Sequence, residues 1–232
     1  MPPSIWSRLL DLIAPRSCAI CGKRLAISEE IICATCNLHL PRTNYAAAAY
    51  ENEMSKRFWG LLPIERAAAL FFYESKSEAS RVILQLKYNN HPEYGEILGK
   101  MVAREFQPQQ FFDGIDALIP IPLAPNRLRQ RGYNQSLEIA RGVQAVTSLP
   151  IITDAVRRNT FTESQTRKTR LERNENVSDV FERIPETDIS GKHILLVDDV
   201  VTTGATATAC GLELLKAQDV RISVLSLAFA KG

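Results

Sequence analysis

Apolar residues follow two different spacings along this chain, and each spacing indicates one kind of element. Runs of apolar residues predict strands at 65–74, 116–122, 152–157, 193–199 and 220–230. Helical spacing of apolar residues separates these runs and predicts helices at 77–88, 93–106, 134–147 and 205–217. Strands that alternate with helices are typical of a parallel sheet flanked by helices, so the sequence predicts an α/β fold.

The rest of the chain divides into shorter segments. Residues 4–14 have the apolar spacing of a short amphipathic helix. The polar and charged stretch 158–177 predicts a long loop or an exposed helical excursion. We therefore expect an N-terminal helix and knuckle module over 1–41, a connector over 42–64 and the α/β domain over 65–232.

Length and composition exclude several classes of protein. The chain has 232 residues, of which 45% are apolar and 23% charged, values that are ordinary for a folded protein and not for a disordered one. No apolar run approaches the roughly 20 residues that cross a bilayer, and no export signal is evident, so the sequence predicts a cytoplasmic protein without a membrane span. Because Lys and Arg total 28 against 26 for Asp and Glu, any nucleic-acid binding must rest on a local basic patch.

Four of the five cysteines lie close together in the N-terminal module. They form two Cys-x2-Cys pairs separated by eleven residues, namely Cys18, Cys21, Cys33 and Cys36. Two such pairs can supply the four thiolates of a closed tetrahedral zinc centre, which is the structural type of zinc site. Two disulfides or unrelated thiols are the alternatives, and a reducing cytoplasm disfavours the disulfides. The sequence therefore predicts a structural zinc ion in a small four-cysteine module.

The segment richest in candidate chemistry follows the predicted strand at 193–199. Two adjacent carboxylates, Asp198 and Asp199, stand where this strand ends, and ligands of α/β sheets bind at the carboxyl ends of strands. Small hydroxyl side chains, a Gly and backbone N–H groups follow and suit an anion, over Val200, Val201, Thr202, Thr203, Gly204, Ala205 and Thr206. Carboxylates accept hydrogen bonds from ribose hydroxyls, so the combined segment indicates a sugar-phosphate site. Each half alone is also common at a solvated strand end or a helix cap.

The residues VDDVVTTGAT at 197–206 resemble the phosphoribosyl pyrophosphate signature of type I phosphoribosyltransferases. Over roughly residues 15–230 the chain is similar to the ComF/GntX-type branch of that superfamily. Further matches are the two cysteine pairs, Leu86-Lys87-Tyr88, Pro120-Ile-Pro-Leu123, the segment from Arg127 to Gln135, and Gln165, Arg173 and Asn176 ahead of Phe181. The resemblance implies a type I phosphoribosyltransferase-like parallel sheet flanked by helices, preceded by the four-cysteine zinc module.

The resemblance also implies roles for individual residues. Asp198 and Asp199 would be the catalytic pair that binds the ribose hydroxyls, and the segment 200–206 would bind the 5-phosphate. A flexible hood that contains Gln165 and Arg173 would close over the reaction centre and exclude water. A surface insertion is the alternative interpretation of this hood.

Basic residues concentrate in one part of the chain, where residues 127–173 contain ten of them against four acidic ones. The resemblance places the pyrophosphate loop there and implies that pyrophosphate is held by Lys87, Arg127, Arg129 and Arg131. The three arginines alternate along the sequence, so in an extended loop they would share one face. The alternatives are a solvated basic loop for the arginines and a lysine that favours the end of its helix for Lys87.

The implied activity is transfer of a phosphoribosyl group from phosphoribosyl pyrophosphate to a nitrogen-base acceptor, with release of pyrophosphate and with Mg²⁺ orienting the leaving group. The sequence shows no base-specific lid, so the acceptor and the activity itself stay open, as does the oligomeric state.

The alternative is a non-catalytic or sensor-type protein that handles single-stranded DNA in natural transformation, with which the resemblance associates ComF-type proteins. The basic segment or the zinc module would then contact single-stranded DNA or the DNA-uptake machinery. For the zinc module we expect stabilisation of the fold first and docking second.

Overall fold

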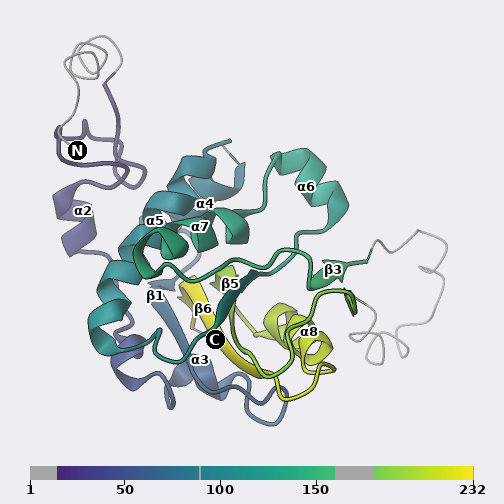
Figure 1. Ribbon diagram of the computed structural model, residues 1–232. Coiled ribbons are helices and arrows are strands. Elements are labelled where there is room, and N and C mark those ends of the chain that lie inside the picture. The colour runs from purple at the N-terminus through teal and green to yellow at the C-terminus, as the bar shows by residue number, and fades with distance from the viewer. Residues whose placement is uncertain (1–14, 89, 160–179, 232) are drawn as a thin grey trace, which may run out of the picture.

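The computed structural model describes residues 15–88, 90–159 and 180–231 (Figure 1). The expected helix at 4–14 lies outside the described residues, as do the hood residues Gln165 and Arg173. Among the residues that are described, no helix combines the length and the apolar character that crossing a bilayer requires.

A four-stranded sheet forms the centre of the molecule. Its strands are β1 (Ala67–Tyr73), β2 (Ala117–Pro120), β5 (His193–Val201) and β6 (Arg221–Ala230). They lie in the order β1-β6-β5-β2, and each neighbouring pair is parallel. The predicted α/β fold with a parallel sheet is confirmed.

Helices cover both faces of this sheet (Figure 1). One face carries α4 (Ser80–Tyr88), α5 (Pro92–Phe106) and α7 (Gln135–Thr147), and the other carries α3 (Glu53–Lys56) and α8 (Ala205–Leu214). Side chains of β5 alternate between the two layers, because Leu195 and Val197 pack with the first group whereas Ile194 and Leu196 pack with the second. The continuous apolar run in this strand is therefore explained by burial on both faces.

The strand expected at 152–157 does not join the parallel sheet. β3 (Val156–Arg158) instead pairs antiparallel with β4 (Phe181–Arg183) in a separate two-stranded sheet. Ahead of β3, Ile151 makes an isolated parallel bridge to β2, and the chain then leaves the sheet. Asp154 is exposed there, and a layer covered on both faces does not accommodate a charged interruption. The prediction was wrong for this reason.

The N-terminal module packs directly on the α/β layer. It contains the short helix α2 (Ala34–Leu38) and an antiparallel bridge between Ser17 and Arg24. Its buried residues, among them Ile20 and Ile32, belong to the same apolar cluster as β1 and α4. Helix α6 (Pro125–Arg131) and two 3-10 helices, η1 (Tyr45–Ala48) and η2 (Gln107–Gln109), complete the described elements. The module thus shares its core with the face of the sheet that carries α4.

Candidate functional site

A cavity of about 310 Å³ lies at the carboxyl ends of β1, β2 and β5. Ligands of open α/β sheets bind at this end of the strands. Several residues that the sequence singled out line it, namely Lys87, Arg127, Arg131, Asp198, Asp199, Val200, Thr202 and Thr206. A smaller hollow of about 30 Å³ adjoins the loop and is lined by residues 198 and 200–207. The structure therefore brings most of the predicted site residues together.

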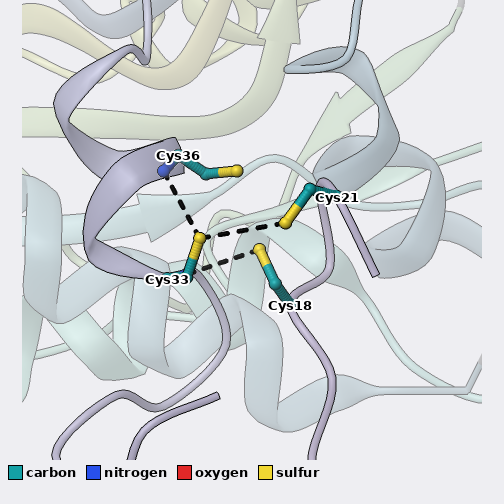
Figure 2. Close-up of side chains that lie close together, drawn as sticks. All are labelled: Cys18, Cys21, Cys33 and Cys36. Atoms are coloured by element: carbon teal, nitrogen blue, oxygen red, sulfur yellow. Dashed lines mark hydrogen bonds between the residues drawn. The ribbon is translucent and has the colours of Figure 1, made fainter. Parts of the chain in front are cut away.

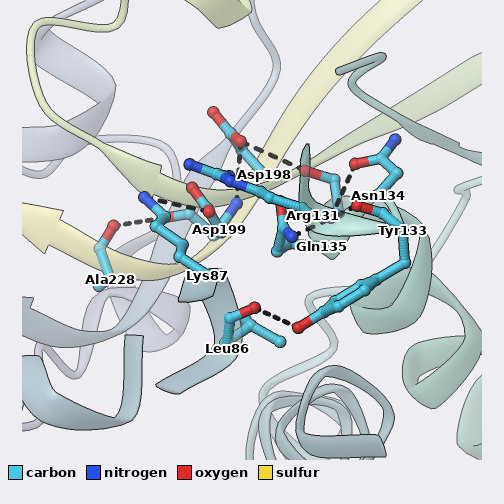
Figure 3. A network of polar contacts seen from close by, with 11 residues as sticks. Leu86, Lys87, Arg131, Tyr133, Asn134, Gln135, Asp198, Asp199 and Ala228 are labelled. Atoms are coloured by element: carbon cyan, nitrogen blue, oxygen red, sulfur yellow. Dashed lines mark hydrogen bonds and ion pairs between the residues drawn. The ribbon is translucent and has the colours of Figure 1, made fainter. Parts of the chain in front are cut away.

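The two carboxylates of β5 have different partners within the cavity (Figure 3). The Asp199 Oδ2 atom lies 3.1 Å from Nζ of Lys87, and both side chains are largely buried. The Asp198 Oδ1 atom accepts hydrogen bonds from the backbone N–H of Asp199 at 2.9 Å and from the hydroxyl of Ser136 at 3.4 Å. Lys87 comes from the last turn of α4 and Ser136 from the first turn of α7, so the pair is held between two helices.

Asp198 titrates in an unusual environment for a carboxyl group. Burial and the adjacent negative charge of Asp199 raise the pKa of Asp198 to about 7, against the opposing effects of the Asp199 backbone N–H, Lys87 and Ser136. A carboxyl group with this pKa gains or loses its proton near neutral pH. Perturbed carboxylates in a cavity are typical of functional sites.

The loop after β5 turns sharply into α8 at Gly204. This residue has φ = 81°, in the left-handed region, and precedes the first residue of α8. A Cβ atom at Gly204 would lie 3.1 Å from the ring of Phe58, which is fully buried. Glycine is therefore required both by the backbone conformation and by the close approach of Phe58. The first residues of the ten-residue helix, 205–207, line the hollow, and the N–H groups of a helix start suit an anion.

The three arginines expected to share one face of an extended loop lie in a helix instead. α6 spans Pro125–Arg131, with Pro125 at its start and Gly132 in the left-handed conformation at its end. Successive helical residues are rotated by about 100°, which separates Arg129 from Arg127 and Arg131. Arg127 and Arg131 line the cavity, whereas Arg129 is not among its lining residues. The expected shared face of the three arginines is therefore not formed, and of the three only Arg127 and Arg131 reach the cavity.

Further polar residues line the cavity although the sequence did not identify them as site residues, among them Asn134, Gln135, Ser136 and Arg158. Arg158 lines it from β3 and lies over the ring of Phe181 at 5.2 Å. Burial and the nearby charge of Arg127 lower the pKa of this guanidinium. Asn134 caps α7 by accepting a hydrogen bond from Ser136 N–H at 3.1 Å. An Asn at the start of a predicted helix is a recognisable cap signal, whereas no local pattern marks Arg158.

The four cysteines of the N-terminal module converge from two turns of the chain (Figure 2). Their sulfur atoms all lie within 4.8 Å of one another, and those of Cys21 and Cys33 are 3.8 Å apart. Four sulfurs around one tetrahedral zinc ion, with bonds of about 2.3 Å, would be about 3.8 Å apart. All four residues are free thiols, so the disulfide alternative is not supported. The cluster could bind a metal ion such as zinc.

Backbone hydrogen bonds favour negative charge on the sulfur of Cys18, whereas burial and the neighbouring cysteines raise the pKa of Cys36. The Cys18 sulfur accepts from the N–H of Cys33 at 3.4 Å, and the Cys33 sulfur accepts from the N–H of Cys36 at the same distance. Burial raises the pKa of Cys18, but backbone hydrogen bonds from Cys21, Cys33 and Ile20 outweigh it and lower the pKa to about 7. Thiolate, not thiol, is the form that binds a metal ion.

Known proteins match this chain along most of its length. No family model matches it. The DNA utilization protein YhgH of Shigella flexneri is 26% identical over 215 residues, which cover 88% of this chain and 93% of that protein. The competence protein ComFC of Bacillus subtilis is 36% identical over 106 residues, which cover 44% of this chain and 41% of that protein. The chain is a homologue of the YhgH and ComF proteins.

This homology confirms the resemblance to ComF-type proteins that the sequence motifs indicated. Among solved structures, the hypoxanthine phosphoribosyltransferase of Trypanosoma cruzi matches 60% of this chain and 78% of its own, with 14% identity and a TM-score of 0.37. The structure of this chain shows a four-cysteine cluster on the N-terminal side and a cavity with paired carboxylates and arginines at the carboxyl end of the sheet.

Proposed function

We propose that this chain binds phosphoribosyl pyrophosphate in the cavity at the carboxyl end of the sheet and transfers its phosphoribosyl group to a nitrogen base. The observation that carries the proposal is that two carboxylates, a helix-start loop and three arginines meet around one cavity of about 310 Å³. A ribose with a 5-phosphate and a pyrophosphate group requires these three kinds of partner.

Each part of the ligand has a chemically matched partner. The carboxylates of Asp198 and Asp199 accept hydrogen bonds from the ribose hydroxyls, and the backbone N–H groups of 202–206 bind the 5-phosphate. Arg127 and Arg131 line the same cavity as the β5 carboxylates, and they bind the pyrophosphate. Arg158 adds a third cation to this region.

Two metal ions belong to the proposal. Carboxylate oxygens are ligands that Mg²⁺ prefers, so Asp198 and Asp199 fit a magnesium ion that enters with the ligand. When bound, this ion would neutralise charge on the pyrophosphate. Zinc fits the four thiolates of the N-terminal cluster, where its role would be to stabilise the module.

The transfer step breaks the bond between the anomeric carbon and the pyrophosphate oxygen, which leaves with the electron pair. A nitrogen atom of the acceptor base forms the new bond and afterwards loses a proton. Positive charge develops on the ribose ring as the leaving group departs, and the carboxylates of Asp198 and Asp199 stabilise it. The arginines stabilise the negative charge that accumulates on pyrophosphate.

Calorimetric titration with phosphoribosyl pyrophosphate and Mg²⁺ tests the ligand assignment. We expect saturable binding to the wild-type chain and none to the double variant Asp198→Asn with Asp199→Asn. Asp113→Asn is the matched control, because Asp113 is an exposed carboxylate outside the cavity lining. Unchanged affinity in the double variant would show that the two carboxylates do not bind the ligand. In a separate assay of the wild-type chain, pyrophosphate release on addition of nitrogen bases would establish transfer.

Handling of single-stranded DNA is the second candidate function. It is favoured by the relatives, which are named as a DNA utilization protein and a competence protein. Exposed arginines of α6 offer cations to a phosphate backbone. Oligonucleotide binding with a steep salt dependence, together with phosphoribosyl pyrophosphate binding but no pyrophosphate release, would favour this function over transfer.

A further inference from the structure

The four-cysteine module touches helix α4 close to the start of that helix. Arg81, in the first turn of α4, donates a hydrogen bond from Nη1 to the backbone carbonyl of Ile20 at 3.1 Å. Ile20 lies between Cys18 and Cys21, in the turn that presents both sulfurs to the cluster. The position of this carbonyl therefore depends on the geometry of the cysteine turn.

The opposite end of α4 reaches the cavity. Lys87 lies in the last turn, and its Nζ atom is 3.1 Å from Asp199 Oδ2 (Figure 3). The preceding residue, Leu86, accepts a hydrogen bond through its carbonyl from the hydroxyl of Tyr133. Arg81 and Lys87 are six residues apart, which corresponds to about 9 Å along a helix. One short helix thus connects the cysteine cluster with the ligand cavity.

Helix α4 is too short to hold its position alone. It has nine residues, and helices of fewer than about twelve residues are marginal without packing partners. Val82, Ile83 and Leu86 are buried against the sheet, in the same apolar cluster as Ile20. This packing and the contacts at both ends together determine where Lys87 is placed.

We infer that the four-cysteine module positions Lys87 through Arg81 and helix α4, and so sets the affinity of the cavity for pyrophosphate-bearing ligands. The inference rests on the proposed function for the identity of the ligand. Arg81 is a positioning residue, because its own side chain contacts the cysteine turn and not the cavity. Coupling between two sites is reciprocal, so a ligand on Lys87 also favours the metal-bound form of the module.

The test is a double-mutant cycle read by calorimetric titration with inorganic pyrophosphate. Arg81→Met removes the donor and keeps the aliphatic part of the side chain, and it should raise the dissociation constant about three- to tenfold. Lys87→Met should raise it at least as much. In the Lys87→Met background, Arg81→Met should have no further effect, because its influence passes through Lys87. Arg81→Lys retains a donor and should recover most of the affinity.

Two controls separate positioning from general damage. Arg104→Met removes an equal charge at an exposed position in the last turn of α5 and should leave pyrophosphate affinity within about twofold. All four cysteines remain in the Arg81→Met variant, so its metal content should equal that of the wild-type chain. Equal losses from Arg81→Met with and without Lys87, or no loss at all, would overturn the inference.

Amide hydrogen exchange provides a readout that needs no ligand. Exchange at residues 80–88 should accelerate in the Arg81→Met variant and on removal of zinc by a chelator, whereas exchange in α8 should stay unchanged. If the wild-type chain binds no pyrophosphate, the proposed ligand is wrong, and the exchange rates still decide the coupling. Unchanged exchange in α4 would refute the coupling even if pyrophosphate binds.

Discussion

Replacing the three arginines of α6 one at a time tests the shape of the proposed pyrophosphate site. In a helix, Arg127 and Arg131 are about 40° apart around the axis, while Arg129 lies about 160° from each. The first two line the cavity, and the third does not. We expect Arg127→Gln and Arg131→Gln to weaken binding of phosphoribosyl pyrophosphate and Arg129→Gln to leave it nearly unchanged.

The magnitude follows from the kind of contact that each arginine can make. Hydrogen bonds to charged groups contribute about 1.5–3 kcal/mol, which corresponds to about ten- to 150-fold in the dissociation constant. Arg127 is exposed and should fall near the lower limit. Arg131 is half-buried and donates to Gln135 Oε1 at 2.8 Å, so its loss should cost more. For Arg129, solvent screening should limit the change to about twofold.

Calorimetry at one fixed salt concentration measures all three variants, and their melting temperatures verify that each is folded. Because every variant loses one positive charge, a general electrostatic effect would weaken all three equally. Equal losses for Arg127→Gln and Arg129→Gln would refute the helical arrangement of this site. Negligible losses for both Arg127→Gln and Arg131→Gln would place the pyrophosphate elsewhere.

Three further predictions concern the carboxylates, the cysteines and the loop. Affinity for phosphoribosyl pyrophosphate, measured by titration at each pH, should rise from about pH 6 to about pH 8. Burial and Asp199 raise the pKa of Asp198 to about 7, and the ionised carboxylate is the better hydrogen-bond acceptor. Any rise that remains in the Asp198→Asn variant belongs to the ligand's own phosphates. Joint replacement of Cys18 and Cys21 by Ser should abolish zinc binding and lower the melting temperature by about 10 °C or more. Metal analysis that still finds zinc in this variant would disprove the four-cysteine zinc site. Gly204→Ala should destabilise the chain by about 1–2 kcal/mol in denaturant unfolding, because φ = 81° is unfavourable for Ala and its Cβ would press on Phe58. An unchanged unfolding midpoint would contradict this interpretation of the turn.

Apolar spacing predicted the main sheet because a strand that is buried on both faces has a continuous run of apolar residues. Residues Ile194 to Val197 are all apolar, and they fill the two cores in alternation. The carboxylates and the loop could be predicted as well, since the whole segment 197–206 is contiguous and lies at the end of that strand. The position of a local motif in the fold can be predicted when the strand that carries it is identified correctly.

The remaining parts of the site depend on choices that a short stretch does not determine. The alternating arginines of 127–131 are compatible with an extended loop, although Pro125 and Gly132 are start and stop signals of a helix, and the helix formed. Arg158 enters the cavity from a two-stranded sheet that pairs segments separated by more than twenty residues of chain. No spacing within either segment could predict that pairing.

A crystal structure of the chain with phosphoribosyl pyrophosphate and Mg²⁺ tests the central claim most directly. The account predicts the 5-phosphate on the N–H groups of residues 202–206, the ribose hydroxyls on Asp198 and Asp199, and the pyrophosphate beside Arg127 and Arg131. A cavity that stays empty at saturating ligand, or a ligand bound away from the two carboxylates, would contradict it.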